Sequence, residues 1–548
     1  TLDNSGVTTA NANRRLQLSS DIDLTSSTLR LIGDGGAATV SSQTLNSLDY
    51  SGGATVSIDT DGTAAGRLTT LNTGSLNRVG QGTLILRNIA NTATTFGTAA
   101  GTQKLIVTLA PAVTNDMIGA NVILWGGANA NDSAQPMFTT YDATHGIQAA
   151  TFDVTSNDVP TLNAATAGQI VDITANSASG NLSGLNLTAQ AVRILVGGAA
   201  TRSVAGTVNI GTTAAAGQGA GLSLVQTRNE GVTHGLTVNF GSQEGLLYVA
   251  STGGSSAVIT LSGAISGSNG LTRFGDGILS LTGTNTFTGP LTINSGETRL
   301  NRNAAGNIAA APASIHPAAP AEINLWGGAL HLNESNQRLN ANLNFFNDSR
   351  FGDVNVSGSA VNNITIQPRV GSNAPVVAWF QDQLGGNIST AYGSLILNGP
   401  AQLAVGNPMQ INAGISGTGR LDRFMNDRLY VGGDSSGYSQ PVTAYAGSLQ
   451  SLNPLSTAKP FGTGPITLNP GSMMRLAAAS NVNAGQVAIR SDLGGISGIG
   501  LSYNSDPVSA LAGLGLTVSS NAPWKGFFGV GSYAASYSFD QSASGLWG

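Results

Sequence analysis

An internal sequence repeat constrains the fold of this chain more than any other feature. The segment Ile265–Phe274 (ISGSNGLTRF) returns as Ile415–Phe424 (ISGTGRLDRF). A shorter copy lies near the start, where Leu76–Leu86 (LNRVGQGTLIL) aligns with Leu271–Leu281 (LTRFGDGILSL). Sequence units that recur in this way usually stack as similar structural units, each in contact with its neighbours only. The internal repeat therefore predicts a repeat protein rather than a set of globular domains.

The composition favours stacked β-structure. The chain has 548 residues, 74 of them Gly, and only 9% are charged, against about 25% in an ordinary soluble domain. Because 41% of the residues are hydrophobic, the low charge does not indicate disorder. When coils stack about 4.8 Å apart, equivalent positions lie above one another, and like charges in such a column repel. Thr, Ser and Asn can share hydrogen bonds there instead.

Cysteine and charge exclude several classes of function. The chain has no Cys, so it has no disulfide, thiolate metal site or Cys nucleophile, which suits a protein that crosses a membrane to the exterior. The net charge is −5 without a basic block, so we predict no nucleic-acid partner. No run of 18 apolar residues occurs, so no membrane-spanning segment is predicted. The chain starts at Thr1 without a charged-then-apolar leader, so we expect that a leader was removed or that this is a piece of a longer polypeptide.

Short strands recur along the whole chain. Typical examples are Thr83–Leu86, Leu105–Leu109 and Ile466–Leu468, each bounded by residues that favour tight corners. An antiparallel sandwich would show hairpin signals about every 8–12 residues, and few occur. We therefore predict an all-β fold, a right-handed parallel β-helix (β-solenoid) that forms an elongated rod with surface loops. With roughly 20–25 residues per coil and about 4.8 Å per step, the rod would be on the order of 100–130 Å long.

The repeats predict four segments of this solenoid. They are an N-terminal segment (1–113), a segment with a surface insertion (114–262), the segment with the clearest repeat (263–412), and a segment with a degenerate repeat and an aromatic-rich C-terminal end (413–548). Three stretches are interpreted as insertions on the surface, namely 114–160, 302–321 and 367–395.

Residues 270–300 carry a motif that is similar to a known family. Two glycines flank a polar turn at Gly275–Gly277, an apolar alternation follows, and the turn Asn285–Gly289 (NTFTG) leads into a closing strand. In this pattern the segment resembles the autotransporter-associated β-strand repeat. The copy after residue 415 departs from the pattern, since Met425 and Asp427 replace the turn glycines. Tyr141–Ile147 (YDATHGI) resembles a spacer found beside such repeats in very large bacterial surface proteins.

The resemblance implies a right-handed β-helix carried outside a bacterial cell, often as a passenger ahead of a membrane barrel. The C-terminal part of this chain is too short in strands to be that barrel. We therefore do not expect the chain to secrete itself alone; it is cut from its transporter or leaves by another route.

Gly433–Gly437 (GDSSG) matches the G-x-S-x-G form of a nucleophile elbow. That motif needs a strand that leads into a helix, to hold the Ser on a strained turn. Here the match falls in the repeat's own turn, where the sister copy Gly283–Phe287 has no Ser. A turn is therefore predicted in place of a catalytic serine.

No metal or catalytic cluster is predicted from the histidines or the acids. His145, His234, His316 and His331 form no i, i+4 pair, and we assign them surface or turn roles. Asp59–Gly62 (DTDG) resembles the start of a calcium loop, but no bidentate Glu follows at the required distance, which favours a polar turn. A pair of carboxylates from neighbouring coils, as in glycoside hydrolases, stays open, although nothing local selects one.

Two further sets of residues each leave two interpretations. Arg78, Arg273 and Arg423 share one repeat position; they cap turn carbonyls or lie along the rod, or they bind an anionic glycan. The aromatic residues of the C-terminal end cap the last coil or form an assembly surface; they are Trp524, Phe527, Phe528, Tyr533, Tyr537, Phe539 and Trp547. Asn-x-Ser/Thr triplets at Asn181, Asn355 and Asn363 are expected by chance in this composition.

These features predict a secreted or surface-displayed bacterial β-solenoid with a structural or adhesive role and no enzymatic activity. Self-assembly into a filament or surface layer is a variant of this role. The alternative is a polysaccharide-binding or polysaccharide-cleaving β-helix protein. The expected partners are other copies of the chain, adjoining segments of a larger protein, or surface glycans. No catalytic, cofactor-binding or metal-binding residue and no cofactor is predicted.

Overall fold

The structure is a computed structural model, and its contacts divide the chain into two units. Unit 1 holds Thr1–Gly306, Ala313–His316 and Trp326–Ala329, and unit 2 holds Asn307–Pro312, Pro317–Leu325 and Leu330–Gly548. The structure describes residues 1–3, 20–34, 40–60, 68–87, 96–97, 103–125, 135–175, 181–197, 202–212, 219–227, 229–251, 257–300, 321–332, 341–353, 360–380, 389–452, 457–490, 498–501, 517–519, 527–532 and 535–536.

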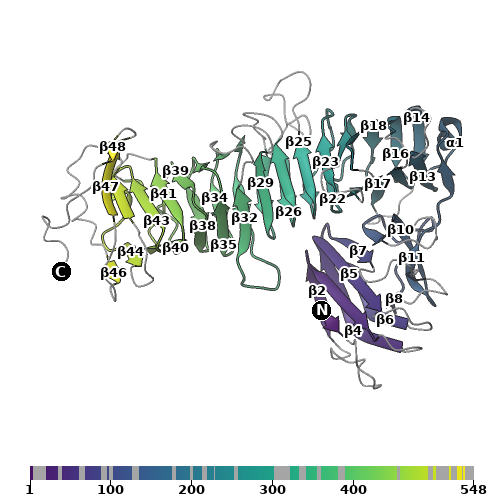
Figure 1. Cartoon of the computed structure of the whole chain (residues 1–548), viewed down its shortest axis with the longest axis horizontal. Helices are drawn as coiled ribbons and strands as arrows, with labels where there is room; N and C mark the ends of the chain where they lie inside the picture. The colour runs from purple at the N-terminus through teal and green to yellow at the C-terminus, as the bar shows by residue number, and fades with distance from the viewer. Residues whose placement is uncertain are drawn as a thin grey trace, which may run out of the picture. The chain divides into compact units, whose positions relative to one another are not determined.

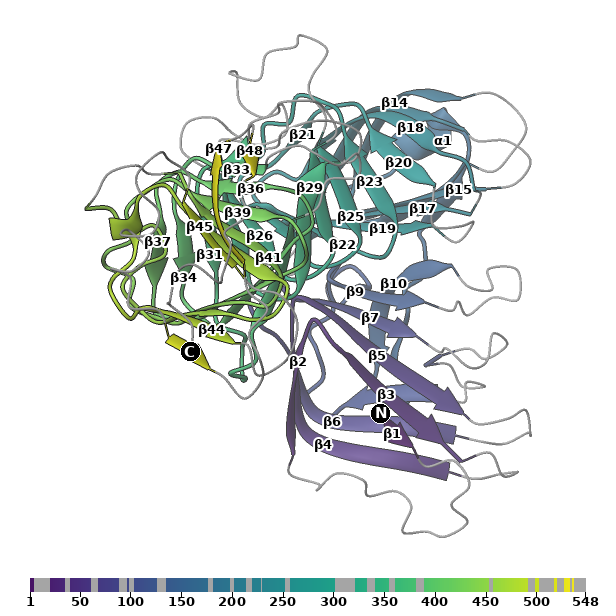
Figure 2. The ribbon, with the colours of Figure 1, turned by 60° about the vertical axis from the view of Figure 1, so that its left-hand side comes forward.

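The N-terminal part of unit 1 is a stack of parallel coils that alternate between two sheets. One sheet runs in the order β1-β3-β5-β7-β9 and the other in the order β2-β4-β6-β8, so each coil gives one strand to each sheet. Figure 2 shows β3, β5 and β7 side by side. The strands are β1 (Leu2–Asp3), β2 (Asp21–Thr25), β3 (Thr28–Gly33), β4 (Val40–Ser51), β5 (Gly53–Thr60), β6 (Leu68–Arg78), β7 (Thr83–Arg87), β8 (Gln103–Val107) and β9 (Val122–Trp125).

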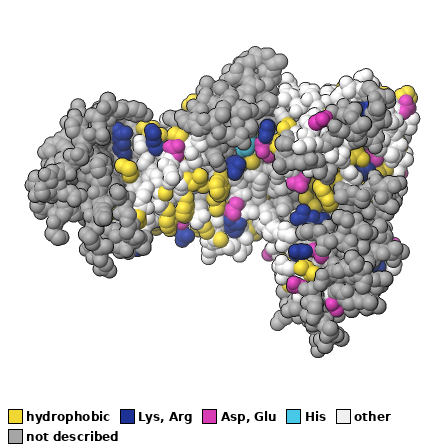
Figure 3. Space-filling model, in the orientation of Figure 1, with side chains coloured by type: hydrophobic (Ala, Val, Ile, Leu, Met, Phe, Trp, Pro, Cys, Tyr) yellow, Lys and Arg dark blue, Asp and Glu magenta, His cyan; other side chains and the backbone are white. Residues whose placement is uncertain are grey.

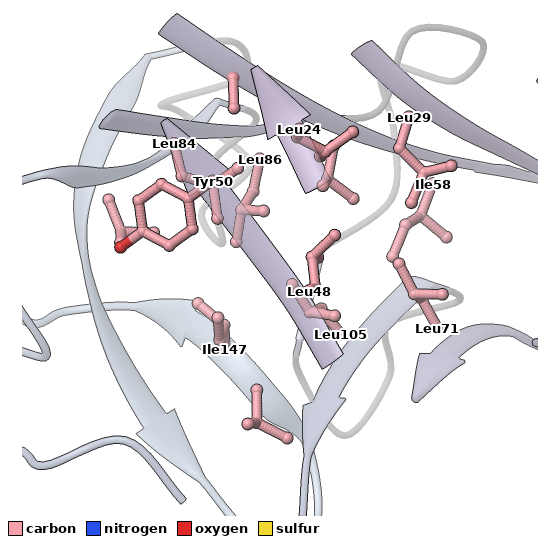
Figure 4. Close-up of a cluster of buried hydrophobic side chains, with 14 of the residues drawn as sticks. Leu24, Leu29, Leu48, Tyr50, Ile58, Leu71, Leu84, Leu86, Leu105 and Ile147 are labelled. Atoms are coloured by element: carbon pink, nitrogen blue, oxygen red, sulfur yellow. The ribbon is translucent and has the colours of Figure 1, made fainter. Parts of the chain in front are cut away.

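Aliphatic columns fill the space between these two sheets. Leu31 of β3 is in register with Ile58 of β5, and both side chains are fully buried. Leu48 of β4 and Leu71 of β6, from the second sheet, belong to the same buried cluster, and Figure 4 shows both with Ile58. Burial of one such side chain contributes about 1.5–3 kcal/mol. Equivalent positions in successive coils therefore stack because each removes its neighbour's apolar surface from water.

An antiparallel segment follows this first stack. β10 (Pro136–Asp142) pairs antiparallel with β9 and with β11 (Gly146–Ala149). The short helix α1 (Val159–Asn163) starts at Asp158, whose carboxylate accepts a hydrogen bond from the Thr161 backbone N–H. Phe138 of β10 is buried in one cluster with Tyr248 and Phe274, which belong to later coils of unit 1.

Parallel stacking continues through the rest of unit 1, again in two sheets. The first sheet contains β12 (Val154–Ser156), β13 (Ile170–Ala175), β15 (Ala191–Val196), β17 (Ala220–Gln226), β19 (Gly245–Ser251), β22 (Leu271–Phe274) and β24 (Leu291–Ile293). The second contains β14 (Leu182–Ala189), β16 (Val204–Ile210), β18 (Val232–Asn239), β20 (Val258–Leu261), β23 (Ile278–Leu281) and β25 (Glu297–Leu300), with β21 (Ile265–Ser266) also beside β18. β15 and β17 are buried along their whole length, as expected for strands covered on both faces.

Unit 2 is a parallel solenoid with three sheets, and Figure 1 shows its strands stacked side by side. The first sheet holds β26 (Ala321–Leu325), β28 (Ala341–Phe345), β31 (Ile364–Ile366), β34 (Leu395–Leu397) and β37 (Ile415–Gly417). The second holds β27 (Ala329–Leu332), β29 (Ser349–Asp353), β32 (Val376–Phe380), β35 (Ala401–Val405), β38 (Leu421–Phe424), β40 (Val442–Ala444), β42 (Ile466–Leu468), β44 (Val487–Arg490) and β46 (Thr517–Ser519). The third holds β30 (Ala360–Val361), β33 (Ser389–Ala391), β36 (Met409–Ile411), β39 (Arg428–Val431), β41 (Gly447–Ser451), β43 (Ser472–Leu476), β45 (Gly498–Leu501), β47 (Phe527–Ser532) and the antiparallel β48 (Ala535–Ser536). A single 3₁₀ turn, η2, covers Ala479–Asn481 in the described part of this unit.

Polar side chains connect successive coils of unit 2 at equivalent positions. Asn342 Nδ2 donates to Glu322 Oε1 at 2.9 Å, and Asn344 Nδ2 donates to Asn324 Oδ1 at 3.1 Å. Both bonds join residues 20 positions apart, which is the length of one coil here. The predicted coil length of roughly 20–25 residues therefore fits this part of the chain.

The predicted all-β parallel solenoid is confirmed, while the handedness of its coils, the length of the rod and the division into four segments stay predictions. The expected insertion at 367–395 is wrong, and that at 114–160 is wrong only in part, since the antiparallel β10 and β11 depart from the parallel stack. Residues 367–395 contain β32 and β33, which pair with strands on both sides, and residues 114–160 contain β9, which pairs in parallel with β7. Because coil length is irregular, these strands do not fall at repeated sequence positions. Residues 302–320 lie outside the described residues. Among those described, no helix is long and apolar enough to cross a membrane.

Candidate functional site

The repeated arginines hold the corners of the solenoid from inside. Arg273 is fully buried, and its Nη1 donates to the carbonyl oxygens of Gly275 (2.7 Å) and Ser295, while its Nη2 donates to that of Gly277. Burial lowers the pKa of Arg273 to about 10, and the charges of Asp276 and Glu297 act in the opposite direction. The guanidinium therefore stays charged at neutral pH and ties one turn to the next coil.

Arg423 repeats this arrangement. It is also fully buried, and its Nη1 donates to the carbonyls of Met425 and Ala446. Met425 stands where the first repeat has Gly275, and both have left-handed backbones, with φ of 69° and 92°. The left-handed turn is therefore the same in both copies, although the second copy has Met where the first has Gly.

The third arginine caps its turn in the same way and adds an ion pair. Arg78 Nε donates to the Gly82 carbonyl at 2.7 Å, and its Nη1 and Nη2 reach the two carboxylate oxygens of Glu244 at 2.7 and 2.9 Å. All three arginines therefore cap turn carbonyls, as one of the two interpretations expected. Arg273 and Arg423, fully buried inside the stack, cannot reach a glycan.

Ser435 in the G-x-S-x-G match is a structural residue. Its hydroxyl is buried, accepts a hydrogen bond from the Ile415 backbone N–H at 2.7 Å, and donates to the Pro460 carbonyl at 2.6 Å. In the other repeat Asn285 Oδ1 accepts from the Ile265 N–H at 2.8 Å. Ser435 and Asn285 thus serve the same corner, and the strand-to-helix turn of a nucleophile elbow does not occur there.

The histidines lie apart, but the expected surface or turn roles are wrong for His234 and His331, which are buried on β18 and β27 because their side chains point into the stack. His145 contacts Asp142 across a surface turn (Nδ1–Oδ1, 2.8 Å). His234 is buried, its Nδ1 accepts from the Val204 backbone N–H at 3.1 Å, and burial lowers its pKa to about 4. His331 is buried, and His316 lies outside the described residues. Within the described ranges no three metal-ligating side chains come together.

The acidic candidates also have structural partners. Asp59 lies on β5 rather than in a turn, is fully buried, and accepts from Arg30 Nε at 2.6 Å; the two residues after Thr60 lie outside the described part of the chain. Asp23 and Asp49 are in register on β2 and β4, but Asp23 is exposed, whereas a glycosidase needs one carboxyl kept protonated by an apolar environment. Asn181 and Asn363 each accept from a backbone N–H of the next coil, and Asn355 is not described.

The described structure presents one surface feature that the sequence analysis missed, an outward column of aromatic residues on the second sheet of unit 2. Trp379 of β32 is in register with Ala404 of β35, and Ala404 with Phe424 of β38. Phe424 stacks on Tyr445, which follows β40, with ring centroids 4.4 Å apart and an interplanar angle of 5°. We call Trp379, Phe424 and Tyr445 the aromatic strip.

The strip is exposed although it is apolar. Trp379 is 38% and Tyr445 44% exposed, while Ala404 between Trp379 and Phe424 is only 4% exposed. Figure 3 shows hydrophobic side chains gathered over the middle strands of unit 2. A partner that covered these rings would remove apolar surface from water, so exposed aromatics in a row mark a contact surface.

Polar and charged groups surround the strip. Arg350 of β29 is in register with Trp379 and is exposed. The neighbouring outward column holds Gln402 and Asp422, and Asp422 accepts from Arg420 Nε at 3.1 Å. Hydrogen-bonding groups thus stand beside the rings. No signal in one coil could reveal the strip, because its members come from three different coils. The aromatic C-terminal end that the sequence did reveal lies mostly outside the described residues, apart from the backbone of β47.

A comparison with curated proteins found a short similarity. The chain is 46% identical over 61 residues to the protein named Adhesin BmaC autotransporter of Brucella suis biovar 1 (strain 1330), which covers 11% of this chain and 2% of that protein. No family model matches the chain, and no solved structure matches it. The likeness to an autotransporter adhesin therefore rests on one short region and on a parallel solenoid compatible with it, and the resemblance to the β-strand repeat family stays a prediction.

Proposed function

We propose that this chain is an adhesive and structural β-solenoid displayed outside a bacterial cell. The observation that carries the proposal is the aromatic strip, a row of exposed rings held on a stacked parallel sheet. The short similarity to an autotransporter adhesin supports both the role and the location. The ladders give the surface a rigid base, since each strand is hydrogen-bonded to the coil before and the coil after it.

A role without catalysis agrees with the contacts of the candidate residues. Ser435 donates and accepts within the backbone of the solenoid, and the buried arginines hold carbonyl groups. The rival function, cleavage of a polysaccharide, requires two carboxylates facing one another across a groove. A reducing-end assay with acidic and neutral polysaccharides tests it directly, and sustained release of sugar ends by the purified chain would establish the rival.

Adhesion can be measured with beads that carry the purified chain and with cultured animal epithelial cells. We expect bound beads, and a fall in binding of about tenfold or more for the combined variant Trp379→Ala, Phe424→Ala and Tyr445→Ala. Tyr392→Ala is the matched control, because Tyr392 is equally exposed (48%) but follows β33 of another sheet. Equal binding by the combined variant and the control, with both folded by circular dichroism, would show that the strip has no part in adhesion.

Self-assembly is a second expectation of this proposal. The end strands of parallel sheets offer unpaired backbone groups, to which another copy or an adjoining segment of a longer protein can pair. Negative-stain microscopy of the purified chain separates single particles from filaments, and single particles at all concentrations would remove self-assembly from the proposed role.

A further inference from the structure

We infer that the aromatic strip binds an acidic glycan, whose sugar rings lie along the column of side chains while Arg350 pairs with its carboxylate or sulfate groups. The inference rests on the proposed adhesive function and names the class of ligand. It concerns residues of unit 2 only.

The spacing of the strip fits a chain of small rings. Trp379, Ala404 and Phe424 occupy successive strands, and strands lie about 4.8 Å apart. Trp379 and Phe424 therefore stand about 10 Å apart along the column, with the small Ala404 between them. The apolar faces of pyranose rings pack well on aromatic side chains, and a glycan chain that runs along the sheet would meet the Trp379 ring and then the Phe424–Tyr445 pair, whose facing sides cover one another.

The area of the strip argues against a folded protein as the occupant. A stable protein–protein interface needs about 800 Å² on each partner. Three rings cover much less, and the position beside Trp379 in the column is the charged and exposed Arg350. The adjacent column offers Gln402, Asp422 and Thr443. A narrow apolar row with hydrogen-bonding neighbours suits a ligand covered with hydroxyl groups.

The local charge favours an acidic glycan over a neutral one. The chain as a whole has a net charge of −5, yet an exposed arginine, Arg350, stands next to the strip. Asp348 and Asp422, the carboxylates near this face, are each paired with an arginine, Arg369 and Arg420 respectively. Arg350 stands one strand from Trp379, so an anionic group of a sugar stacked on Trp379 would lie within its reach.

Titration calorimetry with the full chain tests the inference with three probes, a heparin octasaccharide (sulfate and carboxylate), a hyaluronan octasaccharide (carboxylate) and chitohexaose (neutral). We expect binding of at least one acidic probe, about tenfold weaker binding after Trp379→Ala, and a similar loss after Arg350→Ala for acidic probes only. Tyr392→Ala serves as the control that leaves binding unchanged. The difference between heparin and hyaluronan tells sulfate from carboxylate recognition. Binding should weaken as salt rises, because the exposed ion pair is screened.

The outcomes separate this inference from the proposed function. Equal affinity for chitohexaose, with no effect of Arg350→Ala, overturns the acidic preference. If no oligosaccharide binds, while the strip variant still loses cell adhesion and protease treatment of the cells abolishes it, the partner is a protein and the glycan inference fails although adhesion stands. If the strip variant adheres as well as the unaltered chain, the strip has no adhesive role, and the proposed function is overturned independently of the glycan result.

Discussion

Arg78 and Glu244 are 166 residues apart in the sequence, yet two nitrogens of one meet two oxygens of the other at 2.7 and 2.9 Å. Thr272 Oγ1 also donates to Glu244 Oε1, at 2.5 Å. Both charged side chains are mostly buried, with 16% and 12% of their surface exposed. The pair joins the first stack of unit 1 to its later coils.

Removal of one partner of this pair should destabilise unit 1. We expect Glu244→Gln to lower the free energy of unfolding by about 2 kcal/mol, because Arg78 would keep a buried charge without its counter-ion. The measurement is the midpoint of urea unfolding at neutral pH. In a double-mutant cycle with Arg78→Met, the second substitution should cost less than it does alone; strictly additive losses would mean that the two side chains do not interact.

Met425 provides a stabilising substitution. Its φ of 69° costs a residue with a Cβ about 1 kcal/mol, so Met425→Gly should raise the unfolding midpoint of unit 2. The reverse test is Gly275→Ala, in which a Cβ would lie 2.2 Å from the Val249 carbonyl oxygen. We expect that variant to lose stability. A loss of stability in Met425→Gly would show that the Met425 side chain outweighs its backbone strain.

The corner arginines should not tolerate lysine. An ammonium group cannot reach the carbonyls of Gly275, Gly277 and Ser295 together, so Arg273→Lys should cost about 3 kcal/mol. Arg299→Lys is the control, because Arg299 pairs with one carboxylate, Glu297 (2.6 Å), to which an ammonium group can also pair, so this change should cost clearly less. Urea unfolding followed by circular dichroism compares the two; similar losses would contradict the role given to the buried corner.

His234 makes the stability of unit 1 sensitive to acid. Its pKa is lowered by burial from 6.5 to about 4, so the unfolded chain binds a proton more readily than the folded one. Stability from this group is present above pH 6.5 and is lost as pH falls towards 4, on the order of 3 kcal/mol in full. His234→Asn, whose Oδ1 can accept from the Val204 N–H, should remove that share of the pH dependence. If His234→Asn shows the same difference in unfolding free energy between pH 7 and pH 4.5 as the unaltered chain, His234 is not the source of the acid sensitivity.

The parallel stacking could be predicted because the repeat places equivalent corners at equivalent sequence positions. Arg273 and Arg423 were recognised as one structural position, and the hydrogen bonds confirm that they cap the same turn. Ser435 could be dismissed as a nucleophile for the same reason, since its counterpart Asn285 accepts the same backbone bond.

The aromatic strip could not be predicted, because register between coils depends on the length of every intervening corner. Trp379 and Phe424 point to the same side of the sheet because each is in register with Ala404 on the strand between them. Residues 367–395 resemble an insertion in sequence because they match no repeat, so the sequence gives no reason to place Trp379 in a sheet. The number of sheets per coil, two in unit 1 and three in unit 2, likewise depends on corner geometry that single strands do not encode.

The bond from Arg273 to Ser295 has a consequence for where this chain can be cut. Arg273 donates hydrogen bonds to a carbonyl of its own turn and to the Ser295 carbonyl in the next coil. A fragment that ended between these two residues would bring a cation into a dry interior with an incomplete set of acceptors. Fragments that stop there should be poorly soluble, whereas those that end beyond Leu300 should keep the corner closed.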